Sequence, residues 1–230
     1  MSLKLRDEVL NAILDYKYLL NRGYNQKTSL DLVTSRYMLS RTERMLLFRC
    51  VHSDVDASEI CRKLLTPSEV SNYKMVIDGF NTLLTVTSVL EGDDVYLCDD
   101  CFVRDLRSTK FKDFELEIIK ESAQKLINYI NILKPIDSII ILDKQVSKSG
   151  ELKKILTELL GHVNIVLASK ADIAVLSEGG VIASSDFVIL KKASRVFDIA
   201  GYIISKEFKD KILDLREAIK KHNNFKNHHK

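Results

Sequence analysis

The sequence lacks the features that would place it at a membrane or on nucleic acid at first sight. No apolar run approaches the roughly 20 residues that a membrane-spanning helix needs. The N-terminal segment Met1–Glu8 lacks the apolar stretch of a signal peptide. The formal net charge of +3 is too small to indicate a nucleic-acid partner by itself. We therefore expect a cytoplasmic protein with no membrane partner, and any case for RNA must rest on the local arrangement of charge.

The motifs of several large enzyme classes are missing as well. The chain has no dinucleotide-binding fingerprint, and no residues resemble a Ser-His-Asp triad or a pyridoxal-phosphate lysine. It has no Walker loop, which disfavours a nucleoside triphosphatase. His52 and His162 are isolated in the sequence and need no functional role.

Cysteine is sparse, with four residues in the chain. Cys98 and Cys101 have the spacing of a zinc knuckle, but Cys50 and Cys61 lie too far apart to form a second one. Buried thiols are therefore favoured over a structural zinc site. A disulfide stays open as an alternative. Tryptophan is absent while isoleucine, lysine and glutamate are abundant, a bias compatible with a thermophile, where intracellular disulfides are less unusual.

Helical patterns fill the first part of the chain. Apolar residues recur at three- and four-residue spacing from Leu5 to Leu20. Ser40 and Glu43 form a capping box that predicts the start of a later helix. Because no strand pattern interrupts this region, we expect residues 1–70 to fold as an all-helical N-terminal module.

Strand patterns alternate with helix patterns from Lys74 onward. Alternation of this kind predicts a three-layer α/β domain with a mostly parallel sheet, which we assign to residues 71–205. Residues 206–230 are expected to form a C-terminal helix, over 207–221, followed by a solvated polar tail from His222.

Three of the apolar strand patterns run into an aspartate, namely Asp78, Asp143 and Asp186. The carboxyl ends of parallel strands lie at one edge of a sheet, and neighbouring strands are roughly 4.8 Å apart, so the three carboxylates can converge. Carboxylate oxygens are the ligands that Mg²⁺ and Mn²⁺ prefer. The pattern predicts a divalent-metal site with these three aspartates as metal ligands and catalytic residues. Asp100 and Asp105 are looser candidates for a further ligand.

A structural role is the alternative for each aspartate. Aspartate after a strand often caps the following turn or helix. Capping is favoured for any one of the three alone. The repetition after three successive strands favours a site instead.

Polar residues near these strand ends are candidates for binding substrate. Asn81 follows Asp78 by three residues. The loop after Asp143 ends where a helix is expected to begin, and free backbone amides at a helix N-terminus attract anions. Ser147, Lys148 and Ser149 would add donors and charge there to hold a phosphate, whereas a solvated polar loop is the alternative.

Basic and aromatic side chains also gather in the helical module. Arg41 and Arg44 lie three residues apart and share a helix face, with Tyr37 just before them. Guanidinium groups bind phosphates, and tyrosine can stack on bases. The two arginines are therefore candidates for binding RNA; the alternative is a charged outer face paired with Asp31 and Glu43.

The strand-end motifs resemble those of a known class of nucleases. Val76–Asn81 is similar to the first-strand signature of PIN-like and NYN nucleases, an apolar strand followed by D-x-x-N. The segment Gly179–Leu190 is similar to their late strand, which carries a T/S-x-D motif. This resemblance implies a PIN-like fold in which acidic residues hold Mg²⁺ or Mn²⁺ for phosphodiester hydrolysis, with Asp78 and Asp186 as ligands.

The whole chain more closely resembles a mainly archaeal family, domain of unknown function 434, with a PIN-like C-terminal part. The matching segments are Tyr18–Tyr24, Arg36–Arg44, Cys98–Asp105 and Leu142–Gly150. The resemblance covers most of the chain and implies a fold rather than an activity.

We therefore expect a metal-dependent ribonuclease-like protein that hydrolyses RNA phosphodiester bonds with Mg²⁺ or Mn²⁺ as cofactor. RNA is the expected partner, and the sequence leaves homo-oligomerisation open. The alternative is a catalytically inactive PIN-like scaffold that binds RNA or protein, because functional sites are grafted on folds.

Overall fold

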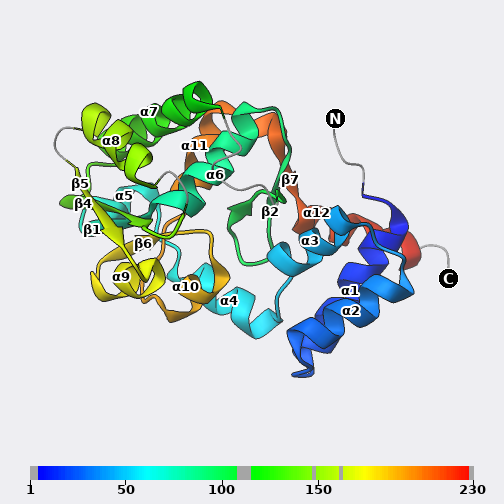
Figure 1. The fold of residues 1–230 in the computed structure, drawn as a ribbon. Helices are drawn as coiled ribbons and strands as arrows, with labels where there is room; N and C mark the ends of the chain where they lie inside the picture. The colour runs from blue at the N-terminus through cyan, green and yellow to red at the C-terminus, as the bar shows by residue number, and fades with distance from the viewer. Residues whose placement is uncertain (1–4, 108–114, 147–148, 161–162, 228–230) are drawn as a thin grey trace.

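The computed structural model describes residues 5–107, 115–146, 149–160 and 163–227 of the chain (Figure 1). It is a mixed α/β structure in which a helical N-terminal region stands beside a parallel sheet. Among these residues, no helix is both long enough and apolar enough to cross a membrane.

Four helices make up the N-terminal region, and a short fifth leads into the sheet. They are α1 (Asp7–Asn21), α2 (Gln26–Arg36), α3 (Arg41–Cys50), α4 (Asp54–Lys63) and α5 (Pro67–Val70). The predicted capping box is confirmed, since the Ser40 side chain accepts from the Glu43 N–H and the Glu43 carboxylate accepts from the Ser40 N–H. Helices α1, α2 and α3 bury their apolar faces in one core that also takes in Tyr96 and Cys98 from later in the chain, whereas Ile60 of α4 packs with the residues under the parallel sheet.

A four-stranded sheet lies at the centre of the second region. Its strands are β1 (Lys74–Asp78), β4 (Asp137–Asp143), β5 (Asn164–Ala168) and β6 (Val181–Ala183), in the order β5-β4-β1-β6. Every pairing is parallel, and Asp78 stands in register with Ile141 of β4. The mostly parallel sheet is therefore confirmed, and its strands all end at the same edge.

Helices cover both faces of this sheet, because consecutive strand residues point to opposite sides. Ile77 packs in the core that holds α6, α7, α8 and α11, whereas Val76 packs in the core that holds α9 and α10. These helices are α6 (Gly79–Leu90), α7 (Leu116–Leu133), α8 (Ser149–Leu160), α9 (Ala171–Ser177), α10 (Phe187–Lys192) and α11 (Ile199–Glu207). Glycine is favoured at position 79, where α6 begins, because a Cβ there would lie 2.6 Å from the Leu142 side chain and 2.8 Å from that of Ile140, and these buried side chains would have to shift.

A second, three-stranded sheet joins the C-terminal segment to the middle of the chain. β2 (Val95–Leu97) pairs antiparallel with β3 (Val103–Arg104) and parallel with β7 (Ile212–Asp214). The expectation of one helix over 207–221 is wrong: a 3₁₀ turn, η2 (Lys209–Lys211), and β7 precede α12 (Leu215–Asn227). A three-residue strand is too short to show a period in the sequence, so its pairing with β2 decides its conformation.

The start of the predicted tail is packed against the N-terminal helices. His222 lies in α12 and is 9% exposed, and its Nε2 is 2.9 Å from Asn11 Oδ1 in α1. Leu215 of the same helix joins the core of the N-terminal region. The expectation of a solvated tail beginning at His222 is therefore wrong at that residue.

Candidate functional site

Asp78, at the end of the central strand, is buried among neutral hydrogen-bond donors. Its side chain accepts from Asn81 Nδ2 at 2.6 Å and from Ser184 Oγ at 2.8 Å, both at Oδ2. Burial raises the pKa of Asp78 to about 6; the two donors oppose this shift and the charge of Asp186 adds to it. Among the described residues, then, no cation compensates the charge of Asp78.

Asp186 comes from the loop after β6 and caps α10. Its Oδ1 accepts from Val188 N at 2.7 Å and from Ile189 N at 3.1 Å. Capping is therefore one role of Asp186 in the structure. A carboxylate has about four lone-pair sites, so capping and metal binding are compatible roles for one side chain.

Asp143 lies at the same sheet edge but turns into its own loop. Its Oδ1 accepts from Gln145 N at 2.7 Å, which is the geometry of an Asx turn. Asp143 is not among the residues that line the cavity described below. The structure thus brings Asp78 and Asp186 together and engages Asp143 in a local turn.

The predicted phosphate loop is only partly described. Ser147 and Lys148 lie outside the described residues. Ser149 is buried, and its Oγ donates to Lys144 O at 3.3 Å. The Ser149 hydroxyl is therefore engaged in a hydrogen bond to the protein backbone.

A cavity of about 220 Å³ lies between the N-terminal helices and the carboxyl edge of the sheet. Arginine, aspartate, asparagine and apolar side chains line it, including Phe48, Arg49, Asn81, Arg104, Asp105, Arg107, Asp186, Phe187 and Val188. Asn81 connects this wall to Asp78 beneath it. Both regions of the chain therefore contribute to one cavity.

The cavity wall holds a carboxylate that does have a cation partner. Arg49 Nη1 donates to Asp105 Oδ1 at 3.1 Å and to Asp105 O at 2.9 Å. Thr85 Oγ1 donates to the other carboxylate oxygen at 3.1 Å. Asp105, predicted as a looser metal-ligand candidate, is thus placed at the cavity and paired with an arginine.

The two arginines predicted to bind RNA do not line this cavity. Arg44 Nη2 donates to Asp31 Oδ1 at 2.6 Å, as the outer-face alternative expects. Arg41, at the start of α3, is exposed. It is their helical neighbours Phe48 and Arg49 that reach the cavity.

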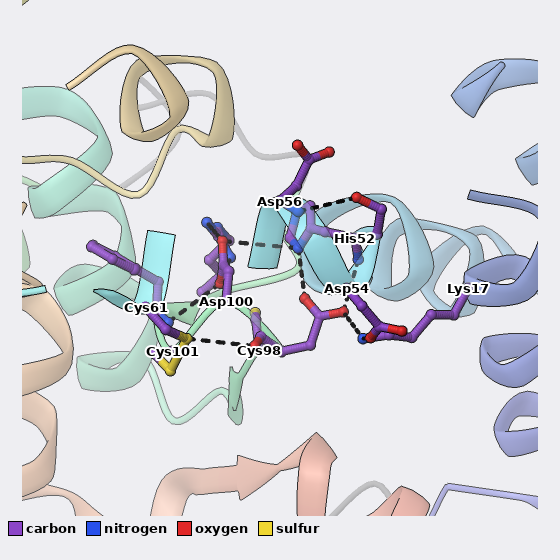
Figure 2. Close-up of polar contacts among 12 residues, drawn as sticks. Lys17, His52, Asp54, Asp56, Cys61, Cys98, Asp100 and Cys101 are labelled. Carbon is purple, nitrogen blue, oxygen red and sulfur yellow. Dashed lines mark hydrogen bonds and ion pairs between the residues drawn. A yellow bond between two sulfur atoms is a disulfide. The ribbon is translucent and has the colours of Figure 1, made fainter. Parts of the chain in front are cut away.

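A second group of ionisable side chains, buried or partly buried, adjoins the cavity through Arg104. Figure 2 shows polar contacts in this group. Asp100 accepts from Arg104 Nη1 at 2.7 Å and from Nη2 at 2.6 Å. Although burial opposes ionisation, the Arg104 guanidinium lowers the pKa of Asp100 below its ordinary value. Asp99 Oδ2 accepts from Lys17 Nζ at 2.9 Å, and Asp99 Oδ1 lies 2.7 Å from His52 Nδ1. We call these five residues the ionic network.

Proximity alone makes part of this network resemble a metal site. Among the described residues, His52, Asp99 and Asp100 bring potential ligand atoms within 4.8 Å of one another. The two carboxylates are already matched by Lys17 and Arg104, however. Both Asp100 oxygens accept from Arg104, so a metal on Asp100, for which the sequence makes it a looser candidate, would have to share the carboxylate with that guanidinium.

The ionic network fixes the loop that carries Asp186. Arg104 Nε donates to Ser185 O at 2.7 Å. On the other side, the His52 ring stacks on Phe187, with centroids 4.0 Å apart and planes inclined by 13°. Both neighbours of Asp186 are therefore held by buried side chains from other parts of the chain.

Sequence reasoning missed several of these residues. His52 looks isolated in the sequence because its partner Asp99 lies 47 residues away, and nothing local marks such a contact. Phe48 and Arg107 carry no motif. Ser184 did carry a signal, since it is the serine of the S-x-D pattern, and it donates directly to Asp78.

Comparison with known proteins finds relatives across the chain. Residues 67–202 match the family model described as domain of unknown function (DUF5616), and residues 8–63 match protein of unknown function (DUF434). The chain is 36% identical over 185 residues to the uncharacterised protein MJ0935 of Methanocaldococcus jannaschii, covering 77% of this chain and 86% of that protein. No solved structure matches the chain. The resemblance to domain of unknown function 434 is thereby confirmed for residues 8–63, while the rest of the chain matches a second family of unknown function.

Proposed function

The chain belongs to the DUF5616 family, and we propose that it is a metal-dependent ribonuclease-like protein, with a PIN-like fold, that hydrolyses RNA phosphodiester bonds. One observation carries the proposal. Asp78 and Asp186 follow two neighbouring parallel strands, and the charge of Asp186 adds to the burial that raises the pKa of Asp78. Asp186 lines a cavity with arginines in its wall, and Asp78 lies behind the lining residue Asn81.

The donor set at this edge suits Mg²⁺ or Mn²⁺. Asp78, Asp186, Asn81 and Ser184 offer oxygen atoms, which hard cations prefer. A bound cation would also remove the repulsion that contributes to the raised pKa of Asp78. We propose Asp78 and Asp186 as metal ligands. Of the other predicted ligands, Asp105 lines the same cavity.

The chain's own residues would orient the reacting groups. Asn81 and Ser184 hold the Asp78 carboxylate, and the backbone of α10 holds Asp186. When bound, the metal supplies Lewis-acid polarisation of the phosphate and an activated water. Arg49 and Arg107 line the wall where the phosphate would lie, and a phosphate there would share guanidinium groups that already pair with Asp105 and with Glu91 and Asp93.

The rim of the cavity suits an unpaired nucleotide. Phe48 is 45% exposed and Val188 is 56% exposed, and both line the cavity. An exposed aromatic side chain beside arginines offers a face on which a base can stack. The substrate-binding residues of the proposal are therefore Asn81, Phe48 and Arg49.

A catalytically inactive scaffold that binds RNA or protein is the second candidate. It is favoured by the structural roles that two predicted ligands already have, since Asp186 caps α10 and Asp143 closes its own turn. This candidate predicts binding at the cavity without any dependence on metal.

Thermal melts with and without millimolar Mn²⁺ separate the two candidates. A cation that binds only the native state stabilises it by RT ln(1 + [L]/Kd), or about 1.4 kcal/mol at ten times Kd. We expect this shift in the wild type and its loss in Asp78→Asn. Asp137→Asn is the matched control, because Asp137 is an exposed aspartate at the opposite edge of the same sheet.

Hydrolysis of labelled RNA by the same proteins completes the test. The proposal expects Mn²⁺-dependent cleavage by wild type and Asp137→Asn but not by Asp78→Asn. A wild type without a Mn²⁺-dependent melting shift or cleavage, which still binds RNA, would establish the scaffold instead.

A further inference from the structure

A disulfide between Cys61 and Cys101 ties the helical region to the turn that carries Asp99 and Asp100 (Figure 2). Cys61 lies in α4, and Cys101 lies between β2 and β3. Both residues are partly exposed. One covalent bond thus joins the two regions beside the ionic network, at a place that solvent can reach.

The other two cysteines are free thiols of a different kind. Cys50 and Cys98 are fully buried. Burial, together with the neighbouring Cys50, raises the pKa of Cys98 well above its ordinary value. Buried neutral thiols are unreactive, because the thiolate is the form that reacts. The chain therefore contains one buried pair of free cysteines and one solvent-accessible pair joined by a disulfide.

A guanidinium lies against the sulfur of Cys101. Arg216 Nη1 is 3.5 Å from Cys101 Sγ, and the same side chain donates through Nε and Nη2 to Asp214 at 3.2 and 3.1 Å. Asp214 thereby holds the positive charge at the sulfur. A cation beside a cysteine stabilises its thiolate and makes that sulfur the better leaving group.

The backbone at Cys101 provides a second, independent observation. Its φ of 72° is left-handed, a conformation that residues other than glycine rarely adopt. Such a conformation persists only where its surroundings impose it. Here the disulfide acts together with the hydrogen bonds from Cys98 N to Phe102 O and from Cys101 N to Cys98 O, so breaking it removes one of the constraints on the turn.

We propose that Cys61 and Cys101 form a reversible thiol–disulfide exchange site whose substrate is a small thiol or dithiol. The incoming thiolate attacks Cys61 Sγ, the Cys61–Cys101 bond breaks, and Cys101 leaves as a thiolate beside Arg216. A second thiolate then attacks the external sulfur and releases Cys61. Two electrons and two protons pass to the protein, and two external thiols become one external disulfide.

Breaking the disulfide changes the contacts that hold the Asp186 loop in the cavity wall. Asp100, one residue before Cys101, holds Arg104, which in turn donates to Ser185 O beside Asp186. Asp99 holds His52, whose ring packs on Phe187. Reduction thus loosens the turn on which both contacts to the Asp186 loop depend. Thiol–disulfide exchange at this site requires neither metal nor RNA, so it goes beyond the proposed function.

Alkylation of the native full-length protein tests the exchange site. The protein is treated with dithiothreitol, trapped with iodoacetamide and read by mass spectrometry. We expect Cys61 and Cys101 to become alkylated while Cys50 and Cys98 stay protected, and oxidised dithiothreitol to restore the bond. Reaction of all four cysteines at one common rate would show that reduction needs global unfolding and would overturn the proposal.

Arg216→Gln tests the part played by the guanidinium. Loss of the charge should slow native reduction roughly tenfold, because the leaving thiolate is less stabilised. Lys220→Gln, which removes one positive charge from the same helix, should leave the rate unchanged. Equal rates in the two variants would overturn the assignment of Cys101 as the leaving sulfur.

Amide hydrogen exchange tests the coupling to the cavity. Oxidised protein is compared with reduced protein and with the Cys61→Ser, Cys101→Ser double variant, all without metal. We expect several-fold faster exchange over residues 99–104 and 184–189 in the reduced protein and in the double variant, both of which lack the disulfide. Identical exchange over 184–189 in the three proteins would overturn the coupling.

Discussion

Two carboxylates in this molecule are almost equally removed from solvent, yet their pKa values shift in opposite directions. Asp78 is 6% exposed and Asp100 is 0% exposed. Burial is the largest influence on both; it raises the pKa of Asp78 to about 6, but for Asp100 the Arg104 guanidinium outweighs it. Partner charge, rather than burial, distinguishes the two.

The difference separates a structural carboxylate from a functional candidate. Asp100 sits in a matched pair that braces Arg104 against Ser185 O. Asp78 accepts only from neutral donors, and the charge of Asp186 adds to the effect of burial on it, so bringing in a cation is favourable there. Perturbed carboxylates of this second kind cluster at functional sites.

Asp100→Asn should have the largest effect on stability. It leaves the buried Arg104 guanidinium without its counterion, and removing one partner of a buried pair costs about 3–5 kcal/mol. Urea unfolding of the variant measures this loss. Asp137→Asn, at an exposed site, should change the free energy of unfolding by less than about 0.5 kcal/mol. A similarly small loss in Asp100→Asn would mean that the pair does not brace the turn.

Asp78→Asn should raise, rather than lower, the free energy of unfolding of the metal-free protein. Because the folded pKa of about 6 exceeds the unfolded value, the native state binds more protons between the two. The free energy of unfolding therefore falls as pH rises through that window and stays lower above it, by up to roughly 3 kcal/mol. A neutral side chain removes this loss.

The pH dependence of unfolding checks the sign. We expect Asp78→Asn to be more stable than the wild type above the pKa of Asp78 and no more stable in acid. Asp198, whose pKa burial also raises to about 6, leaves part of the wild-type slope in the variant. If Asp78→Asn were destabilised at every pH, Asp78 would be a structural carboxylate like Asp100.

The contrast also explains what could be read from the sequence. The parallel sheet, the capping box and the convergence of Asp78 with the Asp186 loop follow from local patterns, because strand ends and caps are encoded by neighbouring residues. The partners of Asp99 are not, since Lys17 and His52 lie 82 and 47 residues away from it. The segments around Asp78 and Asp100 look alike in the sequence. Only the contacts in the folded chain show that, among the described residues, Asp100 is paired with a cation and Asp78 is not.

Phe48→Ala should affect RNA binding and leave the two carboxylates unchanged. Stacking on an aromatic side chain contributes about 1–3 kcal/mol per base, so affinity for single-stranded RNA should fall by roughly 5- to 150-fold. Fluorescence anisotropy in EDTA measures it without hydrolysis. Tyr24→Ala is the control, as an exposed aromatic residue that does not line the cavity. Equal affinity in the two variants would remove the cavity from the RNA-binding surface.

Arg44→Ala should have the smallest effect, because its ion pair lies at the surface. Arg44 and Asp31 are 37% and 53% exposed, and surface pairs contribute about 0–1 kcal/mol. Each phosphate contact that is lost should flatten the salt dependence of RNA binding by about one unit of slope. We expect that change in Arg49→Ala, whose side chain lines the cavity, and no change in Arg44→Ala. A flatter slope in Arg44→Ala would instead restore the sequence-based assignment of Arg41 and Arg44 to RNA, and would move the binding surface from the cavity to the outer face of α3.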